Sequence, residues 1–407
     1  MAKYFWVIGG GLLQVPLIEE AKALGLNVIV SDGSPNCVCK PLSDLFFHID
    51  IFNHDAHIQK ANELLQEGHE INGVLAAGID APETMARLAE YLNLPTVSSE
   101  IAHLVNHKDK FRAEMKRLNL PTPQFEIINI HNKHHLNAIL DKIKFPLIVK
   151  NTSSSGSRGT KLFFQEDRDG VSEMIDEAIS VSRSGNALIE SLWEGTEHTV
   201  ETLFDVNGTF HRCFITDRLF DKSNGFAIET GLVHPTQLSK DEQDEMYQLA
   251  ESVARQLGIK IGAAKYDMIQ TSNGPRIIEM TVRLSGGFDC QYLVPAATGK
   301  NVLKATILTA LGKPFDANEL HDKKNRVALS ESIWPKPGKL IAINGLDCIK
   351  TMPGFEYIFF RYQVGDTIEL YTDCTKRVCF IIVSGQSLAE AKQNMANIKS
   401  KLECVVE

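Results

Sequence analysis

Alternation of strand-like and helix-like segments in the first hundred residues limits the fold more than any other feature of this chain. Short apolar runs recur there, and amphipathic stretches separate them. Strands that alternate with helices form βαβ units, in which the strands are parallel and the helices cover the sheet. We therefore predict a parallel α/β domain over residues 1–105. The strand-like runs are YFWVIG (4–9), NVIVSD (27–32) and GVLAAG (73–78), and the helix-like stretches are 14–24 and 81–92.

Composition excludes several classes of partner. The chain has 407 residues, 43% of them hydrophobic, which is enough for two or three packed domains. Its net charge of −9, without a run of Lys and Arg, argues against nucleic acid. No apolar stretch reaches the roughly 20 residues of a membrane-spanning helix, so we expect a cytoplasmic protein that does not enter a membrane. The eight cysteines have no zinc-knuckle spacing and are expected to be reduced thiols.

The rest of the chain is expected to form units of mixed α/β and α+β character. Pro121 and Pro123 end a helical region and begin a new unit. A small α+β module, centred on the strand FPLIVK, covers 121 to about 190, and a more β-rich module runs from 187 to 311. Residues 326–407 have the strand and helix pattern of a small terminal domain.

Three glycines after the first strand-like run have two interpretations. Gly9, Gly10 and Gly11 precede a helix-like stretch, and Asp32 closes the next strand-like run, which suggests a dinucleotide-binding fingerprint. The further glycine of that fingerprint is missing, because Leu12 and other large residues follow directly. A helix start here could accept an anionic ligand. A tight turn that requires glycine explains the residues equally well, and a dinucleotide-dependent oxidoreductase stays an alternative.

A second glycine-rich segment has the composition of a phosphate-binding loop. Lys150 is followed by NTSSSGSRG (151–159), which offers backbone N–H groups and hydroxyls to phosphate oxygens. The lysine precedes the glycines, so this is not a Walker A loop. An exposed Ser/Gly turn is the alternative that composition alone favours.

Two pairs of carboxylates accompany this loop in the sequence. Glu190 and Glu197 flank a predicted turn, whereas Asp267 and Glu279 fall on two strands joined by a Ser-Asn-Gly turn, with Arg283 four residues further on. Carboxylates on adjacent antiparallel strands can face one another and hold Mg²⁺. An arginine on the same face can bind phosphoryl or carboxylate oxygens. A charged surface hairpin explains either pair alone, but the combination with the loop favours a centre that handles phosphate.

Together these motifs resemble the ATP-grasp superfamily over nearly the whole chain. The resemblance implies an N-terminal α/β domain (1–105), an ATP-grasp domain (106–325) with a small lid at about 121–190, and a C-terminal α+β domain (326–407). The segment IGGGLLQVPLIEEAKALG and the C-terminal tail are most similar to the group of L-amino acid ligases. Biotin carboxylase and carbamoyl-phosphate synthetase are more distantly similar.

The resemblance also implies the ligands of ATP and metal. Nucleotide contacts are implied for Lys108 or Lys110, Lys150, Ser154, Ser155, Gly156, Ser157, Gly159, Glu190, Leu192 and Glu197. In this set Glu190 and the backbone of Leu192 would meet adenine, and Glu197 the ribose hydroxyls. The implied metal residues are Asp267, Glu279 and Thr281, where threonine replaces the family's asparagine and is a poorer ligand. The implied cofactors are ATP and Mg²⁺, which Mn²⁺ can replace.

The reaction that the resemblance implies is the ATP-dependent ligation of a small carboxylate to an amine. The carboxylate is activated as an acyl phosphate, with release of ADP and phosphate, and Lys150 and Arg283 are the catalytic residues. Substrate contacts are implied for Glu229, His234 and Arg283. Ser285, Gly286 and Gly287 follow directly, and their backbone N–H groups are expected to approach the acyl phosphate, with a plain turn as the alternative. The implied partners are the small carboxylate and the amine, within a homodimer. The alternatives are a carboxylase acting through carboxyphosphate and a non-catalytic nucleotide-binding protein.

Overall fold

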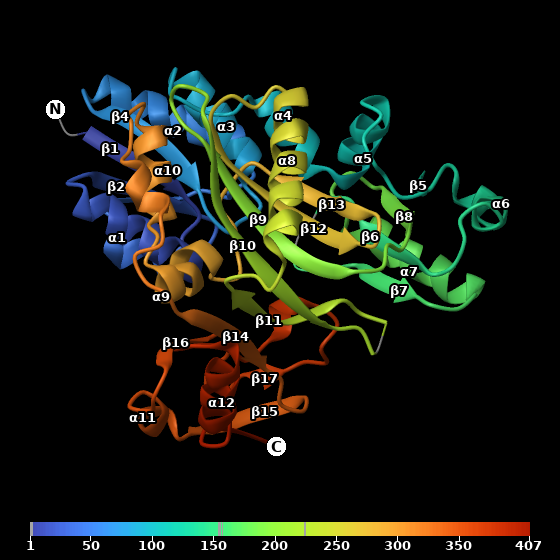
Figure 1. Cartoon of the computed structure of the whole chain (residues 1–407). Coiled ribbons are helices and arrows are strands. Elements are labelled where there is room, and N and C mark those ends of the chain that lie inside the picture. Colours follow the sequence, from blue (N-terminus) through green and yellow to red (C-terminus); the bar gives the residue numbers. More distant parts are fainter. Residues whose placement is uncertain (1–2, 154–155, 157, 224) are drawn as a thin grey trace.

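The N-terminal domain is the parallel α/β unit that the sequence predicts. In this computed structural model, which describes residues 3–153, 156, 158–223 and 225–407, its sheet has the order β3-β2-β1-β4 with all pairs parallel. Strands β1 and β2 are almost fully buried because helices cover the sheet (Figure 1). The elements are β1 (Lys3–Ile8), α1 (Val15–Ala23), β2 (Asn27–Asp32), β3 (Leu45–His48), α2 (His54–Gln66), β4 (Glu70–Ala76) and α3 (Pro82–Tyr91).

Two short helices connect this domain to the rest of the chain. Helix α4 (Ser99–Asn106) is capped by the Ser98 hydroxyl, and α5 (Lys108–Arg117) follows after one residue. That residue, His107, has an extended backbone with φ −111° and ψ 106°, so it forms a corner between the two helices. The corner brings Lys108 to the next domain, where its N–H donates to the carbonyl of Thr152 at 2.8 Å.

The lid is a separate four-stranded antiparallel sheet with helices on one side and an apolar core of its own. Its order β5-β8-β6-β7 brings Lys150 and Glu190 onto neighbouring strands. The predicted loop residues Ser154, Ser155 and Ser157 lie outside the described residues. The elements are β5 (Phe125–Ile128), α6 (Leu136–Leu140), β6 (Leu147–Asn151), β7 (Thr160–Phe163), α7 (Arg168–Val181) and β8 (Ala187–Ser191).

A large antiparallel sheet of eight strands dominates the remainder, in the order β13-β12-β9-β10-β11-β14-β18-β16. Its first strands share one apolar core with the N-terminal domain, whereas the lid core is distinct. Helix α8 packs on this sheet and begins at a capping box, in which Ser239 and Glu242 bond each other's backbone N–H. The elements are β9 (Thr196–Phe204), β10 (Phe210–Asp221), β11 (Ile228–His234), α8 (Lys240–Gln256), β12 (Gly262–Thr271), β13 (Gly274–Thr281), α9 (Val294–Thr298) and α10 (Val302–Ala310).

The C-terminal residues do not form a sheet wholly of their own. Strand β14 pairs with β11, so β14, β18 and β16 extend the large sheet, and only β15, β17 and β19 make a separate three-stranded sheet. Pairing satisfies the backbone groups that an open edge of β11 would expose. The elements are β14 (Val327–Ile333), β15 (Gly338–Asn344), α11 (Leu346–Ile349), β16 (Phe355–Phe360), β17 (Thr367–Ile368), β18 (Cys379–Gly385), α12 (Leu388–Lys399) and β19 (Glu403–Val406).

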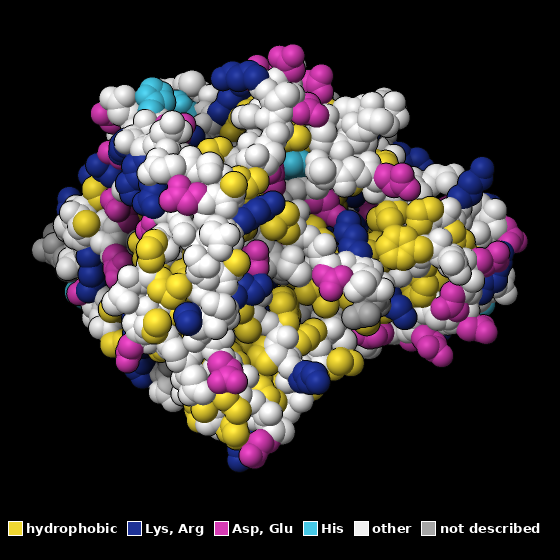
Figure 2. Space-filling model, turned by 60° about the horizontal axis from the view of Figure 1, so that its bottom comes forward, with side chains coloured by type: hydrophobic (Ala, Val, Ile, Leu, Met, Phe, Trp, Pro, Cys, Tyr) yellow, Lys and Arg dark blue, Asp and Glu magenta, His cyan; other side chains and the backbone are white. Residues whose placement is uncertain are grey.

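The surface agrees with the charge balance of the sequence. Basic and acidic side chains alternate over the face drawn in Figure 2, and no broad field of Lys and Arg is visible among the described side chains there. Within the described ranges, no helix has both the length and the apolar character needed to cross a bilayer. No disulfide bond joins the described cysteines.

Candidate active site

A cavity of about 300 Å³ lies between the lid and the large sheet. Strands β6 and β8 of the lid, strands β9 to β13 of the large sheet and the loop after β13 contribute its wall. Twelve of the residues predicted to bind ATP, metal or substrate line this cavity, although they come from distant parts of the chain. They are Lys108, Lys150, Gly156, Glu190, Leu192, Glu197, Glu229, Asp267, Glu279, Arg283, Gly286 and Gly287.

Asp267 and Glu279 face one another across β12 and β13, as direct partners in the register. Asp267 is 3% exposed and forms ion pairs with Arg218, at 3.0 Å from Nη1, and with Lys265. The Oε2 of Glu279 lies 3.3 Å from the Nζ of Lys108. Burial, together with the facing Glu279, raises the pKa of Asp267. Burial opposes the ionisation of Glu279 as well, but Lys108 and Lys265 outweigh it and hold its pKa well below the usual range.

This donor set fits a hard divalent cation. Two carboxylates that must share a buried space repel each other, and a cation between them removes the repulsion. Thr281 adds a second observation, because its Oγ1 is buried and has no hydrogen-bond partner within the described part of the chain. Thr281 lines a smaller adjoining cavity of about 40 Å³ together with Glu279 and Arg283. Asp267, Glu279 and Thr281 therefore offer oxygen atoms of the kind that Mg²⁺ prefers.

At the lid end of the cavity, Glu190 is only 3% exposed and two cations neutralise it. Its carboxylate forms ion pairs with the Nε of Arg112 and with the Nζ of Lys150. Burial opposes its ionisation, but Arg112 and Lys150 outweigh burial and lower its pKa. Arg112 also donates to the carbonyls of Ile277 and Ile278, at 2.9 and 2.6 Å. Strand β13 is thereby fixed to the lid through one buried guanidinium.

The predicted nucleoside contacts already have partners in the protein. The carboxylate of Glu197 lies 2.6 Å from the Nζ of Lys222, and both line the cavity. The backbone N–H of Leu192 donates to the carbonyl of Pro146 at 3.0 Å. Trp193 lines the same end, with its ring 5.6 Å from the guanidinium of Arg112. An apolar wall with a few polar atoms is suited to a flat base.

At the opposite end, Arg283 and the glycines after β13 approach the N-terminal domain. The Nε of Arg283 donates to the carbonyl of Ile79 at 2.9 Å. Ser285 was expected to offer its N–H to a ligand, but that N–H donates to both carboxylate oxygens of Glu201 at 3.1 Å. Glu201 is fully buried, and burial raises its pKa to about 7. Gly286 and Gly287 remain in the cavity wall.

A buried acidic floor lies beside this end. The Oε2 of Glu229 accepts a 2.8 Å hydrogen bond from the Nε of Arg218, and the Oδ1 of Asp289 has no partner in the described part of the chain. Burial opposes the ionisation of Glu229, but Arg218 and Arg377 outweigh it and lower its pKa. Burial, with Glu229 and Glu201 nearby, raises the pKa of Asp289 well above its usual range. The surroundings therefore favour the ionised form of Glu229 and the protonated form of Asp289, and both residues line the cavity.

Five of the predicted residues that the structure describes lie outside this cavity wall. Thr281 lines the smaller cavity and Ser285 is engaged with Glu201, as described above, and the other three are Lys110, His234 and Gly159. Lys110 is exposed and its Nζ contacts the Nε2 of His103, so Lys108 is the lysine of α5 that reaches the cavity. His234 is buried, with its Nδ1 2.9 Å from the carbonyl of Ile215, and it packs against Phe214. Gly159 supports the lid loop instead, with a φ of +60° and a carbonyl that accepts from the N–H of Asn151.

Several ionisable residues of the cavity were not predicted from the sequence. They include Lys222, Arg377, Lys265, Arg218, Asp289 and Arg112. Lys265 could have been found, because it lies two positions before Asp267 and so projects from the same strand face. Arg218 and Asp289 carry no such signal. Arg112 stands in the charged stretch KDKFRAEMKR, which is typical of an exposed helix face, yet it is 1% exposed. Its role depends on contacts with residues more than 70 positions away.

The glycines of the N-terminal loop serve packing. The N–H of Gly10 donates to the Oδ2 of Asp32 at 2.7 Å, so this carboxylate is already engaged. A Cβ atom at Gly10 would lie 2.4 Å from the Sγ of Cys37, which leaves no room for a side chain. A tight turn that requires glycine accounts for both observations.

Comparison with known proteins places the chain among enzymes with this architecture. The description "Carbamoyl-phosphate synthase L chain, ATP binding domain" matches residues 107–318, and "L-amino acid ligase C-terminal domain 2" matches residues 333–407. Carnosine synthase 1 of Homo sapiens is 24% identical over 333 residues, which make up 76% of this chain and 40% of that protein. This chain therefore spans about two-fifths of the length of that relative.

Two solved structures have the same fold. The L-amino acid ligase from Bacillus licheniformis superposes with a TM-score of 0.82 and 22% identity, covering 100% of this chain and 99% of that one. The biotin carboxylase domain dimer of the Hydrogenobacter thermophilus 2-oxoglutarate carboxylase, in complex with MgADP, ADP and bicarbonate, has a TM-score of 0.74 and 18% identity, covering 100% and 91%. At such identities the likeness establishes a shared fold.

Proposed function

We propose that this chain is an ATP-dependent carboxylate–amine ligase. It belongs to the family described as "Carbamoyl-phosphate synthase L chain, ATP binding domain", and hence to the ATP-grasp superfamily. A carboxylate oxygen of the acid attacks the γ-phosphorus of ATP, and the bond from that phosphorus to the bridging oxygen of ADP breaks. The amine nitrogen then attacks the acyl carbon and loses a proton, and phosphate leaves. The products are an amide or peptide bond, ADP and phosphate.

The residues of the cavity suit this chemistry because phosphoryl transfer needs positioning and charge neutralisation more than a nucleophilic side chain. Lys108 and Lys150 both line the cavity, each with its ammonium group beside a carboxylate. Arg283 stands where a phosphoryl or carboxylate group would meet the glycines after β13. Mg²⁺, or Mn²⁺ in its place, would be held by Asp267 and Glu279 and would neutralise charge on the phosphates.

The observation that carries the proposal is the pairing of Asp267 with Glu279 in register, surrounded by Lys108, Lys265 and Arg218. A surface hairpin would expose such charges to water. Here Asp267 is buried and three cations converge on two carboxylates inside a cavity. Preorganised charge in a dry cavity stabilises a developing charge far more strongly than it does in water.

A coupled assay tests the reaction. Purified protein with ATP and Mg²⁺ is given pairs of amino acids and small acids, with and without bicarbonate, and ADP, AMP and phosphate are quantified. We expect ADP and phosphate in equal amounts, dependent on both substrates. AMP and pyrophosphate would overturn the acyl phosphate mechanism. Release of ADP and phosphate that requires bicarbonate would favour the carboxylase. Binding of nucleotide without release of ADP and phosphate would favour a non-catalytic protein.

The partners in this proposal are the two small-molecule substrates and a second copy of the chain, in a cytoplasmic homodimer. Support for the dimer comes from the domain dimer of the biotin carboxylase relative. Light scattering on the purified chain measures the mass directly, and 45.2 kDa is the value for one copy. A mass near that of one copy would remove the dimer from the proposal and leave the ligase chemistry in place.

A further inference from the structure

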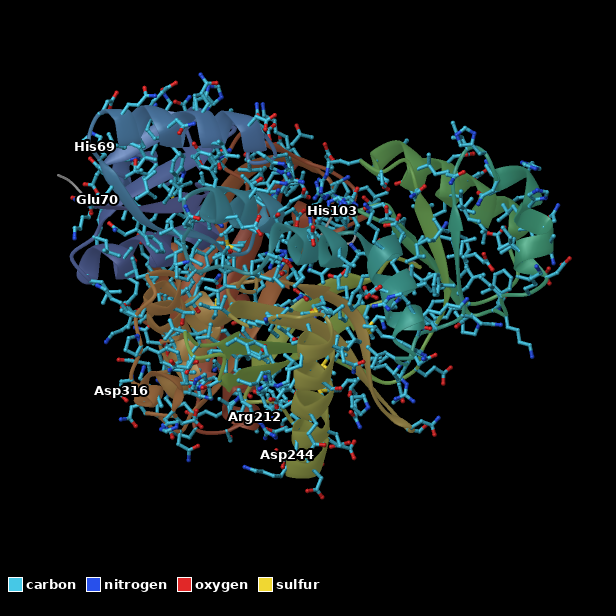
Figure 3. All side chains as sticks on the ribbon, turned by 90° about the horizontal axis from the view of Figure 1, so that it is seen from above. His69, Glu70, His103, Arg212, Asp244 and Asp316 are labelled. Carbon is cyan, nitrogen blue, oxygen red and sulfur yellow. The ribbon has the colours of Figure 1, made fainter. Side chains whose placement is uncertain are left out.

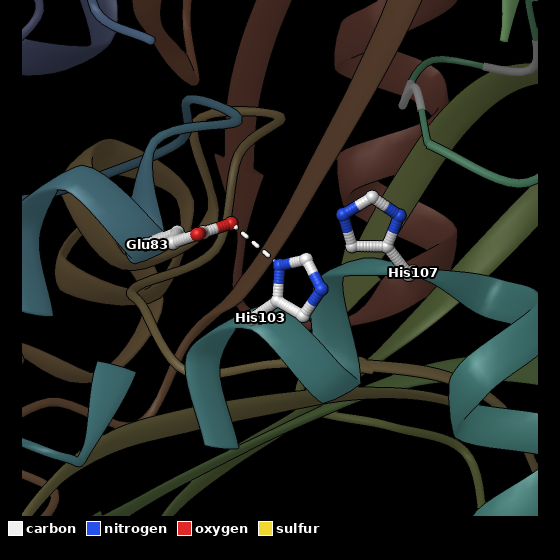
Figure 4. A group of neighbouring side chains, drawn as sticks. All are labelled: Glu83, His103 and His107. Carbon is white, nitrogen blue, oxygen red and sulfur yellow. Dashed lines mark hydrogen bonds and ion pairs between the residues drawn. The ribbon is translucent and has the colours of Figure 1, made fainter. Parts of the chain in front are cut away.

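A second cluster of potential ligands lies outside the cavity, between α3 and the corner of α4 and α5. Glu83 on α3, His103 on α4 and His107 at the corner point toward a common centre (Figure 4). Each offers one ligand atom, and these atoms all lie within 4.8 Å of one another. Seen from above, His103 stands between the N-terminal helices and the lid (Figure 3). None of the three residues lines the cavity described above.

Hydrogen bonds already orient the cluster. The Nδ1 of His103 lies 2.9 Å from the Oε2 of Glu83, while Arg87 donates to the other oxygen, Oε1, from its Nε at 3.0 Å. Arg87 thus holds the carboxylate and leaves Oε2 facing the histidine. The rings of His103 and His107, one helical turn apart, have centroids 4.5 Å from each other.

A ring nitrogen of His107 is available to a ligand. Its Nδ1 is buried and has no hydrogen-bond partner in the part of the chain that is described. A neutral imidazole nitrogen keeps a lone pair that can bind a metal ion.

We propose that Glu83, His103 and His107 bind one transition-metal ion of the Zn²⁺ class. Two imidazoles and a carboxylate form a common three-residue zinc ligand set, with water as the fourth ligand. Imidazole nitrogen suits Zn²⁺, Ni²⁺ and Cu²⁺, whereas Mg²⁺ prefers oxygen. The site is therefore chemically distinct from Asp267 and Glu279, and it does not depend on the proposed ligase reaction.

Two small movements accompany binding. Bonds of about 2.0–2.1 Å in a tetrahedral site place ligand atoms about 3.3 Å apart. The Oε2 of Glu83 and the Nδ1 of His103 are already 2.9 Å apart, and all three ligand atoms lie within 4.8 Å of one another, so small side-chain shifts reach this spacing. Lys110, whose Nζ contacts the Nε2 of His103, turns away into solvent. Lys110 is exposed and the His103 side chain is 37% exposed, so both can move without disturbing the core.

The position of the site gives the ion a structural consequence. An ion there clamps α3 to the corner at His107, and the next residue, Lys108, reaches Glu279 in the cavity. We therefore expect the bound ion to stabilise the junction between the N-terminal domain and the lid. An ion that binds only the folded state raises its stability in proportion to its affinity.

Calorimetric titration tests the site. The full chain is stripped with EDTA and titrated with ZnCl₂ in its wild-type form, as His103→Ala/His107→Ala, and as His134→Ala/His135→Ala. The control pair lies in the lid, with ring centroids 3.9 Å apart. We expect one equivalent of Zn²⁺ in the wild type, binding at least 10-fold weaker in the first variant, and unchanged binding in the control. Equal affinity in the first variant, or loss in the control, would overturn the proposal.

Spectroscopy and a milder variant cover the case in which the double variant folds poorly. Co²⁺ added to the wild type should produce the visible absorption of a four-coordinate nitrogen and oxygen site. Glu83→Gln, which keeps size and shape, should weaken Zn²⁺ binding. Asp267→Asn should leave it unchanged, because that carboxylate lies in the other site. A Co²⁺ spectrum typical of the six-coordinate aqueous ion, or Zn²⁺ binding lost in Asp267→Asn, would refute the three-residue site.

Discussion

The two ends of the cavity use the same kinds of ion pair in different ways. At the lid end, Glu190 is 3% exposed and balanced by Arg112 and Lys150. At the sheet end, the Glu279 side chain is 33% exposed and faces the carboxylate of Asp267. At the lid end, the buried charge of Glu190 is neutralised by protein side chains. At the sheet end, two carboxylates face each other in register, and one of them, Glu279, is accessible to a ligand.

The difference separates a structural ion network from a reactive one. Breaking a buried network exposes the partner left behind to a full desolvation penalty, whereas changing an open carboxylate alters what it can bind. We therefore expect Arg112, which has no predicted contact with ATP or substrate, to act mainly on the stability of the protein, and Glu279 to act on turnover with the fold intact.

Arg112→Ala is expected to have the largest effect. It removes this donor from the carbonyls of Ile277 and Ile278 and leaves Glu190 with Lys150 as its only ion-pair partner among the described residues. Removing one partner of a buried ion network costs about 3–5 kcal/mol of unfolding free energy. Urea unfolding followed by circular dichroism measures this cost. Arg117→Ala, on the same helix but paired with Glu114 at an exposed position, is the matched control and should cost less than about 1 kcal/mol. Equal costs would show that Arg112 contributes no more than a surface pair.

Glu279→Gln tests the sheet end. The neutral amide is a weaker ligand for Mg²⁺ than the carboxylate, so we expect phosphate release to fall by about 10²–10³-fold, a loss comparable to that of one essential electrostatic contact. The unfolding free energy should change little. Glu251→Gln on α8, paired with the exposed Arg255, controls for loss of charge. Wild-type turnover in Glu279→Gln at limiting Mg²⁺ would show that the β12–β13 hairpin carries charged residues without binding a catalytic metal ion.

Arg283→Lys should have a smaller effect on the same reaction. The charge stays, but the planar fork of donors is lost, which typically costs about 1.5–3 kcal/mol for one charge-assisted hydrogen bond. This corresponds to about a 10- to 100-fold fall in kcat/KM. ATP affinity, measured by calorimetry, should be retained because the resemblance assigns the phosphate contacts to Lys108 and Lys150. A large loss of ATP affinity with unchanged kcat would show that Arg283 binds the nucleotide and does not act in the chemical step.

Glu201→Gln concerns a carboxyl group with no ion pair among the described residues, on the same sheet. Its folded pKa of about 7 lies above the unfolded value near 4.5, so the folded state keeps a proton that the unfolded state has lost. The protonated Glu201 therefore contributes to the free energy of unfolding below pH 4.5, and this stabilisation is lost as the pH rises to 7. Wild-type stability should therefore fall by about 1 kcal/mol per pH unit between pH 5 and pH 7, relative to Glu201→Gln. Urea midpoints for both proteins across this range measure the difference, and parallel curves would contradict it.

Local patterns in the sequence predict much of the lining of this cavity. The facing of Asp267 and Glu279 was predicted from a turn signal between two strand-like runs, and Lys150 was singled out because it closes an apolar strand before a glycine-rich loop. Arg112 could not be found in this way. Its charged neighbours predict an exposed helix face. Arg112 is buried because Glu190 and the carbonyls of Ile277 and Ile278, which are distant in the sequence, contact its guanidinium in the fold.

The alternation of strands and helices and the strand pairs that carry carboxylates could be predicted from the chain alone, because they depend on periodicity and on spacings of a few residues. The resemblance of the motifs to the ATP-grasp superfamily added the predicted ligands. Which charges meet follows from the three-dimensional fold. Lys108 lines the cavity, whereas Lys110 and His234 do not, and the N–H of Ser285 donates to Glu201. The physical reason is that Coulomb and hydrogen-bond energies depend on distance in space and on burial, and strands far apart in the sequence set both.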